Sequence, residues 1–125
     1  MTQLFLIAGA LYGATGVLLG AFGAHALASR LSASSASSWD TAVQYQLVHA
    51  LALVGVGVLG RLAGTQLLPL SLTVSGWSFI IGVLFFSGSL YALALEGPRL
   101  VGPVTPVGGV AFVVGWLALA VYARN

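Results

Sequence analysis

The chain has 125 residues, of which 59% are hydrophobic and only 5% are charged. A soluble domain carries about 25% charged residues, so this composition predicts an integral membrane protein. The net charge of +2 comes from four scattered basic residues and two acids, and without a basic cluster it gives nucleic-acid binding no support. The chain has no cysteine, which excludes disulfides, thiolate metal sites and a cysteine nucleophile.

Four apolar runs are long enough to cross a bilayer, since a membrane helix needs about 20 mainly apolar residues. We expect spans over residues 4–27, 41–59, 74–95 and 104–123. The first run lacks the basic start of a signal peptide and is longer than its apolar region, so we expect it to be retained. The predicted fold is all-α: one domain, residues 1–125, forming an integral membrane four-helix bundle with antiparallel neighbours and both termini on the same side.

Short polar segments separate these runs. The stretch SRLSASSASS is predicted to be a linker, and Ser37, Ser38 and Asp40 are candidate caps for the second helix. Thr41 and Gln44 fit a capping box. We call side A the membrane side with both termini and loop 60–73, and side B the side with loops 28–40 and 96–104. Each side has two arginines, so the positive-inside rule leaves the orientation open.

Small residues mark the predicted helix contacts. In the first span, five glycines recur at steps of four and three residues, which places them on one helix face. Such a stripe lets another backbone approach closely, and close packing drives helix association inside a membrane. The predicted packing residues are Gly9, Gly13, Gly16, Gly20, Gly23, Gly82, Gly108 and Gly115. The sequence does not decide whether these glycines pack within one chain or between chains.

Polar residues gather toward side B. At 1.5 Å per residue, His49 lies roughly 15 Å inward from Trp39, near the middle of the membrane. It shares a helix face with Tyr45 and Gln46. A polar residue at this depth is a functional candidate, and the simpler alternative is a neutral histidine that fixes helix register through a hydrogen bond. The candidate polar pocket contains His25, Tyr45, Gln46, His49, Ser87, Ser89, Tyr91 and Thr105.

No catalytic, cofactor or metal site is predicted. The chain has two histidines, whose depths differ by roughly 10 Å, whereas a zinc site needs three or four ligands. No Ser-His-Asp spacing or pair of carboxylates is present. The glycine-rich stretch GALYGATG resembles a nucleotide-binding loop, but it lies inside the first span, which argues against dinucleotide binding. We therefore expect no enzyme activity, and an intramembrane enzyme is the weakest of the alternatives.

Four motifs resemble those of a known family of small membrane proteins. They are GAFGAHAL (20–27), YQLVHALAL (45–53), LFFSGSLYALAL (84–95) and TPVGGVAFVVGW (105–116). In this order they resemble the domain of unknown function 423 family, which includes YgdD-like bacterial proteins and transmembrane protein 256 of animals. The resemblance implies a four-span protein of the bacterial inner membrane or of a eukaryotic organelle. It implies no mechanism and no catalytic residues, because the family's function is not established.

Two functions remain open. The first is a small non-enzymatic structural or accessory subunit, whose partners are the lipid bilayer and either other membrane subunits or further copies of the chain. The alternative is a transporter, a channel, or a lipid- or small-ligand-binding protein. That alternative would use the polar pocket around His49, open to side B.

Overall fold

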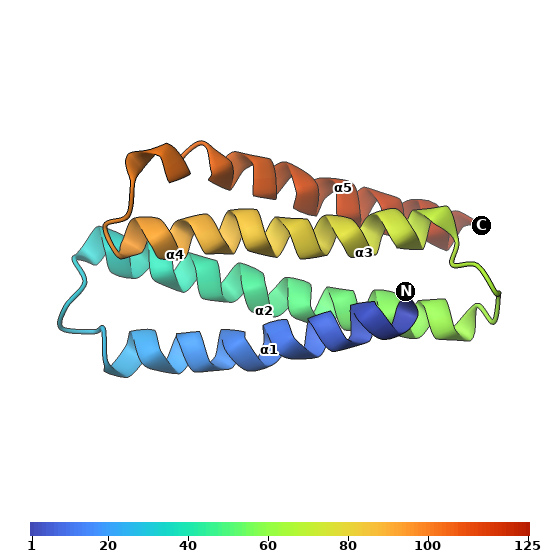
Figure 1. Cartoon of the computed structure of the whole chain (residues 1–125), viewed down its shortest axis with the longest axis horizontal. Helices are drawn as coiled ribbons and strands as arrows, with labels where there is room; N and C mark the ends of the chain where they lie inside the picture. Colours follow the sequence, from blue (N-terminus) through green and yellow to red (C-terminus); the bar gives the residue numbers. More distant parts are fainter.

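The computed structural model describes all 125 residues, and its regular elements are all helices (Figure 1). In chain order these elements are α1 (Thr2–His25), α2 (Ala33–Leu62), α3 (Leu70–Gly82), the π-helical turn η1 (Val83–Ser87), α4 (Gly88–Ala94), the 3₁₀ turn η2 (Arg99–Val101) and α5 (Val104–Arg124). The segments α3, η1 and α4 are continuous and form the third span. Four helices are long and apolar enough to cross a membrane, which confirms the predicted fold class.

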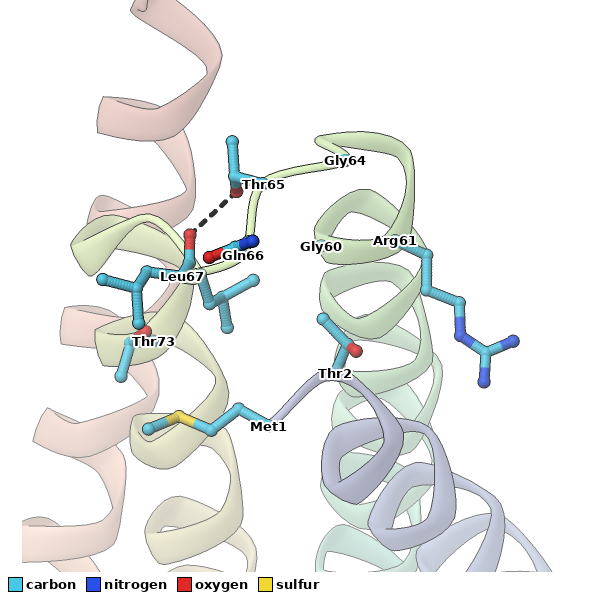
Figure 2. Close-up of a pocket in the computed structure, with 10 residues that line it drawn as sticks. Met1, Thr2, Gly60, Arg61, Gly64, Thr65, Gln66, Leu67 and Thr73 are labelled. Carbon is cyan, nitrogen blue, oxygen red and sulfur yellow. Dashed lines mark hydrogen bonds between the residues drawn. The ribbon is translucent and has the colours of Figure 1, made fainter.

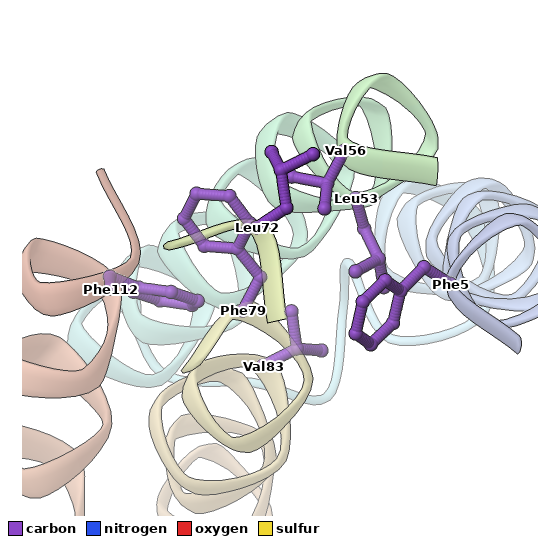
Figure 3. Close-up of a cluster of buried hydrophobic side chains, with 7 residues drawn as sticks. All are labelled: Phe5, Leu53, Val56, Leu72, Phe79, Val83 and Phe112. Atoms are coloured by element: carbon purple, nitrogen blue, oxygen red, sulfur yellow. The ribbon is translucent and has the colours of Figure 1, made fainter. Parts of the chain in front are cut away.

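The four spans run antiparallel, and both termini lie at the same end of the bundle (Figure 1). Figures 1 and 3 place α2 and the third span in the centre, with α1 and α5 at opposite outer corners. The outer helix α1 contacts α2 along its length, and α5 contacts the third span. In cross-section the bundle is therefore a rhombus rather than a square.

The start of α2 differs from the sequence-based prediction. The helix begins at Ala33, and its cap is Ser32, whose Oγ accepts a hydrogen bond from the backbone N–H of Ser35 at 3.2 Å. Asp40 and Thr41 lie within the helix, so the predicted cap was wrong. Several serines offer the same capping chemistry, and the sequence does not distinguish the one that is used. At about 1.5 Å per residue, α2 is longer than the hydrocarbon core of a bilayer. Its first turns have the polar sequence ASSASS, so we place these turns beyond that core on side B.

The main hydrophobic core draws on all four spans (Figure 3). Its fully or nearly fully buried members are Phe5, Leu53, Val56, Leu72, Phe79, Val83 and Phe112. A second, smaller cluster at side B contains Leu27, Trp39 and Ala94. Buried polar side chains lie beside the main core as well as between the two clusters, since the imidazole of His49 packs directly on Phe79 and Phe112 of that core.

Candidate functional site

The buried side chain of Gln46 on α2 forms hydrogen bonds to two other spans, α1 and the third span. Its Nε2 donates to the backbone oxygen of Tyr12 at 2.9 Å and to Oγ1 of Thr15 at 2.8 Å, both on α1. Its Oε1 accepts a hydrogen bond from the Tyr91 hydroxyl on α4 at 2.7 Å. Both N–H groups and the carbonyl of this 4% exposed side chain are therefore satisfied.

His49 joins α2 to α5, and its partners determine where its proton lies. The indole N–H of Trp116 is only a donor, and it lies 3.0 Å from Nε2 of His49. The backbone oxygen of Tyr45 is only an acceptor, and it lies 2.7 Å from Nδ1. Nε2 therefore accepts and Nδ1 carries the hydrogen, which defines a neutral imidazole with both nitrogens occupied.

Aromatic rings enclose the imidazole. The ring of Phe112 stacks on His49 with centroids 3.6 Å apart and planes 10° apart. Phe79 lies 5.5 Å away at a tilt, and Trp116 approaches edge-on at 5.9 Å. His49 is only 4% exposed. In a membrane this packing holds the imidazole in one orientation and keeps lipid and water from it.

Two buried serines connect the third span to its neighbours. Ser87, at the end of the π-helical turn η1, donates to the backbone oxygen of Ala42 at 2.7 Å. Ser89 hydrogen-bonds the backbone oxygen of Phe86 and the hydroxyl of Thr105 on α5. A π turn adds one residue to the helix and thus rotates the rest of the span by about 100°. The turn therefore sets which neighbours Ser89 and Tyr91 reach.

Sequence reasoning missed four members of this set, one of which is Thr15, the partner of Gln46. Tyr12 donates through its hydroxyl to the backbone oxygen of Ile80 at 3.1 Å, linking α1 to α3. Trp39 donates to the backbone oxygen of Leu19 at 2.9 Å, linking α2 to α1. Trp116 is the partner of His49. The signal was available, because a tyrosine or tryptophan inside a span carries a polar group that needs a partner.

Not all predicted pocket residues come together. His25 is the last residue of α1 and is exposed, away from the buried polar residues. Tyr45 is 42% exposed, and its ring packs on Phe86 at 4.5 Å. The other six predicted residues form interhelical contacts rather than the lining of a main cavity. A ligand role for them stays a prediction.

Most of the predicted packing glycines lie where a side chain would collide. A Cβ on Gly9 would come within 2.9 Å of the backbone oxygen of Ala50, and one on Gly16 within 2.7 Å of Leu47. Gly13 is different, because a Cβ there would meet nothing within 4 Å. Each of the remaining glycines faces a side chain or backbone of another span: Gly20 faces Val43, Gly23 faces Trp39, Gly82 faces Phe112, Gly108 faces the Phe86 backbone and Gly115 faces Phe79.

A cavity of about 380 Å³ opens on side A, where the start of α1 meets the loop between α2 and α3 (Figure 2). Thr2, Thr65, Gln66 and Thr73 supply uncharged polar groups to its lining. Arg61 borders it, but in Figure 2 its guanidinium points away from the loop. The cavity therefore offers hydroxyl and amide groups, and Met1 also lines it.

These features define an integral membrane protein built as a four-helix bundle with polar bonds between its spans. The chain belongs to the family described as protein of unknown function DUF423, whose model matches residues 19–109. This confirms the resemblance noted in the sequence.

Curated relatives cover nearly the whole chain. A UPF0382 membrane protein of Staphylococcus saprophyticus is 44% identical over 119 residues, which is 95% of each chain. The UPF0382 membrane protein YwdK of Bacillus subtilis is 40% identical over 97% of this chain and 96% of its own. A UPF0382 membrane protein of Haemophilus influenzae is 42% identical over 96% of this chain and 93% of its own. No solved structure matches the chain.

Proposed function

We propose that the protein is a non-enzymatic structural or accessory subunit of the bacterial inner membrane, which works in an assembly with other membrane subunits or with further copies of itself. The observation that carries this proposal is the hydrogen bonding of the buried polar side chains. Gln46, His49, Ser87 and Ser89 are all hydrogen-bonded to groups of the bundle, most of them on neighbouring helices. Among the buried polar side chains only the hydroxyl of Ser75 in α3 is left without a partner. A transport path or an active site needs a set of groups left free for a substrate.

Polar bonds connect each pair of spans that lie side by side. Gln46 and Trp39 link α2 to α1, and Tyr12 links α1 to α3. Ser87 links the third span to α2. Trp116 links α5 to α2, and Ser89 and Thr105 link α5 to the third span. Interhelical hydrogen bonds of this kind stabilise helix association in membranes, which supports a structural role.

The outer surface supports an assembly. Large apolar side chains are exposed along every span, among them Leu18 at 69%, Leu51 at 76%, Leu84 at 56% and Leu117 at 63%. These surfaces suit either lipid chains or the helices of another subunit. The small bundle has little internal space of its own, so a role that depends on contact with neighbours fits its construction.

Cysteine crosslinking in native membranes tests the proposal, since the chain has no cysteine of its own. Single cysteines replace Leu18, Leu51, Leu84 or Leu117, one on each span. A cysteine at Leu67, 86% exposed in the loop on side A, serves as the control for random collision. We expect crosslinks from one or two spans only, to a second copy or to a defined membrane protein, and a matching complex in native-lipid discs.

Two results would contradict the proposal. One is a monomer without partners in native-lipid discs, together with crosslinking no stronger than that of the loop control. The other is an ion or solute flux in proteoliposomes that His49→Asn abolishes while the bundle remains folded. The second result would favour the alternative, a transporter or channel that uses the region around His49.

A further inference from the structure

A second cavity, of about 260 Å³, lies at side B between the connection of α1 to α2 and the end of α4. It is separate from the buried polar residues around Gln46 and His49. Leu27, Leu31, Ala94 and Leu95 form its apolar part, and Arg30, Ser32, Ser35 and Glu96 form its polar part. Leu27 and Ala94 also belong to the small buried cluster at this end. The cavity therefore has an apolar floor that continues into the bundle and a polar rim.

The rim brings opposite charges to one place. The chain contains four basic and two acidic residues in all, and Arg30 and Glu96 both line this cavity. The hydrogen bonds formed here are those of Ser32 with Ser34 and Ser35 and those of the backbone. The guanidinium and the carboxylate are therefore available to a ligand that carries both a negative and a positive group.

The start of α2 strengthens the positive part of the rim. The cap residue Ser32 and Ser35 of the first turn line the cavity, and the N–H of Ser35 is donated to Oγ of Ser32. The positive end of the helix dipole lies at this side of the cavity and favours an anion such as a phosphate. Arg30 adds a planar donor fork that suits phosphate oxygens.

The backbone at Glu96 closes the C-terminal end of α4, where the N–H of Glu96 donates to the Leu93 oxygen and that of Gly97 to the Ala92 oxygen. Glu96 has φ of 59°, a left-handed conformation, and is the only non-glycine residue with positive φ in the chain. It lies just beyond the C-terminal end of α4, a position where glycine is usual. Residues other than glycine in this conformation carry strain. The strain is tolerated here at the residue that supplies the carboxylate of the rim.

The position of the cavity indicates where the ligand comes from. The spans end at this level, and the first turns of α2 reach beyond the hydrocarbon core. The volume lies below the range of about 300 to 1,000 Å³ for pockets that enclose a whole drug-sized molecule. A headgroup fits such a space while acyl chains lie along exposed apolar surface such as Leu95, which is 55% exposed.

We propose that this cavity binds the phosphoethanolamine headgroup of a membrane phospholipid. Arg30, beside the positive end of the α2 dipole, holds the phosphate, and the carboxylate of Glu96 accepts hydrogen bonds from the primary ammonium. A choline headgroup has the same charges but no N–H donor, and a glycerol headgroup has no positive group. The site therefore selects phosphatidylethanolamine over phosphatidylcholine and phosphatidylglycerol. This inference does not depend on the proposed function.

Native mass spectrometry of the full-length protein, stripped of lipid in detergent, tests the site. The protein is titrated with phosphatidylethanolamine, phosphatidylcholine and phosphatidylglycerol with identical acyl chains. We expect about tenfold tighter binding of phosphatidylethanolamine, the effect of one charge-assisted hydrogen bond. Equal binding of the three lipids, or preference for phosphatidylcholine or phosphatidylglycerol, would overturn the proposal.

Three variants separate the two charges. Glu96→Gln should abolish the preference for phosphatidylethanolamine over phosphatidylcholine, and Arg30→Gln should weaken binding of both lipids by about tenfold. Arg99→Gln is the matched control, because Arg99 is exposed at the same end but does not line the cavity. A loss in the control as large as that in Arg30→Gln would mean non-specific attraction and would overturn the assignment.

A soluble competitor distinguishes a lipid from a free headgroup compound. Glycerophosphoethanolamine carries the same phosphate and ammonium without acyl chains. We expect it to leave phosphatidylethanolamine bound when present at the same concentration as the lipid. Displacement of the lipid under these conditions would contradict the lipid assignment, because the site would then recognise a soluble phosphoethanolamine compound equally well.

Discussion

Replacing Gln46 by methionine tests how much the buried polar bonds contribute to the fold. Methionine has a similar size and shape, so the change removes hydrogen bonds with little loss of volume. Three bonds disappear: those to the Tyr12 backbone oxygen, to Thr15 Oγ1 and from the Tyr91 hydroxyl. Thr15 still donates to the backbone oxygen of Leu11, whereas the Tyr91 hydroxyl is left without this partner.

The expected loss of stability is the sum of these contributions. Interhelical hydrogen bonds in membrane proteins average about 0.6 kcal/mol each, so three bonds contribute about 2 kcal/mol. The unpartnered Tyr91 hydroxyl raises the expected loss toward about 3 kcal/mol. Reversible unfolding in mixed SDS–lipid micelles, monitored by circular dichroism, measures the change in the free energy of unfolding.

A double-mutant cycle with Tyr91→Phe isolates one of the three bonds. The combined variant Gln46→Met/Tyr91→Phe should lose less stability than the sum of the single variants, because both remove the same bond. We expect a difference of at least about 0.6 kcal/mol. A Gln46→Met variant as stable as the wild type, or losses that add to within about 0.3 kcal/mol, would refute the reasoning.

Three further changes give results in the same unfolding assay. Gly9→Ala should lose about 1 to 3 kcal/mol through a clash with the α2 backbone, whereas Gly13→Ala, which meets open space, should be neutral; equal effects would contradict the close packing of α1 on α2 at Gly9. Trp116→Phe should lose about 0.6 to 1.7 kcal/mol by removing the donor to His49, and an unchanged stability would mean that this bond contributes nothing to the fold. Glu96→Gly should raise the free energy of unfolding by about 1 kcal/mol, because glycine adopts the left-handed backbone without strain. Glu96→Ala should not raise it. An increase in both variants would show that the carboxylate, rather than the backbone conformation, is unfavourable.

The number of spans and their antiparallel order could be predicted because length and hydropathy decide them. The boundary of α2 could not, since Ser32 and the serines after it are interchangeable as caps by residue type. The π turn at 83–87 has no counterpart in the sequence pattern. It arises where α5 lies close to the third span, and Gly108 there faces the Phe86 backbone.

The buried polar residues could also be predicted only in part. Helical spacing correctly put Gln46 and His49 on one face of α2, toward the bundle interior. It could not name their partners, because these come from other spans: Tyr12, Tyr91 and Trp116. Depth along the helix also could not tell a pocket from a set of interhelical bonds, because both gather polar residues at the same level.

The most direct test of the central claim is the ¹⁵N solid-state NMR spectrum of histidine-labelled protein in lipid bilayers. The claim is that the buried polar groups other than the Ser75 hydroxyl are committed to hydrogen bonds within the bundle. For His49 it predicts a neutral ring with the proton on Nδ1, an unprotonated Nε2 correlated with the indole N–H of Trp116, and no magnetisation transfer from water. An Nε2-protonated ring, or transfer from water to its nitrogens, would contradict the claim, because His49 would then face an open path.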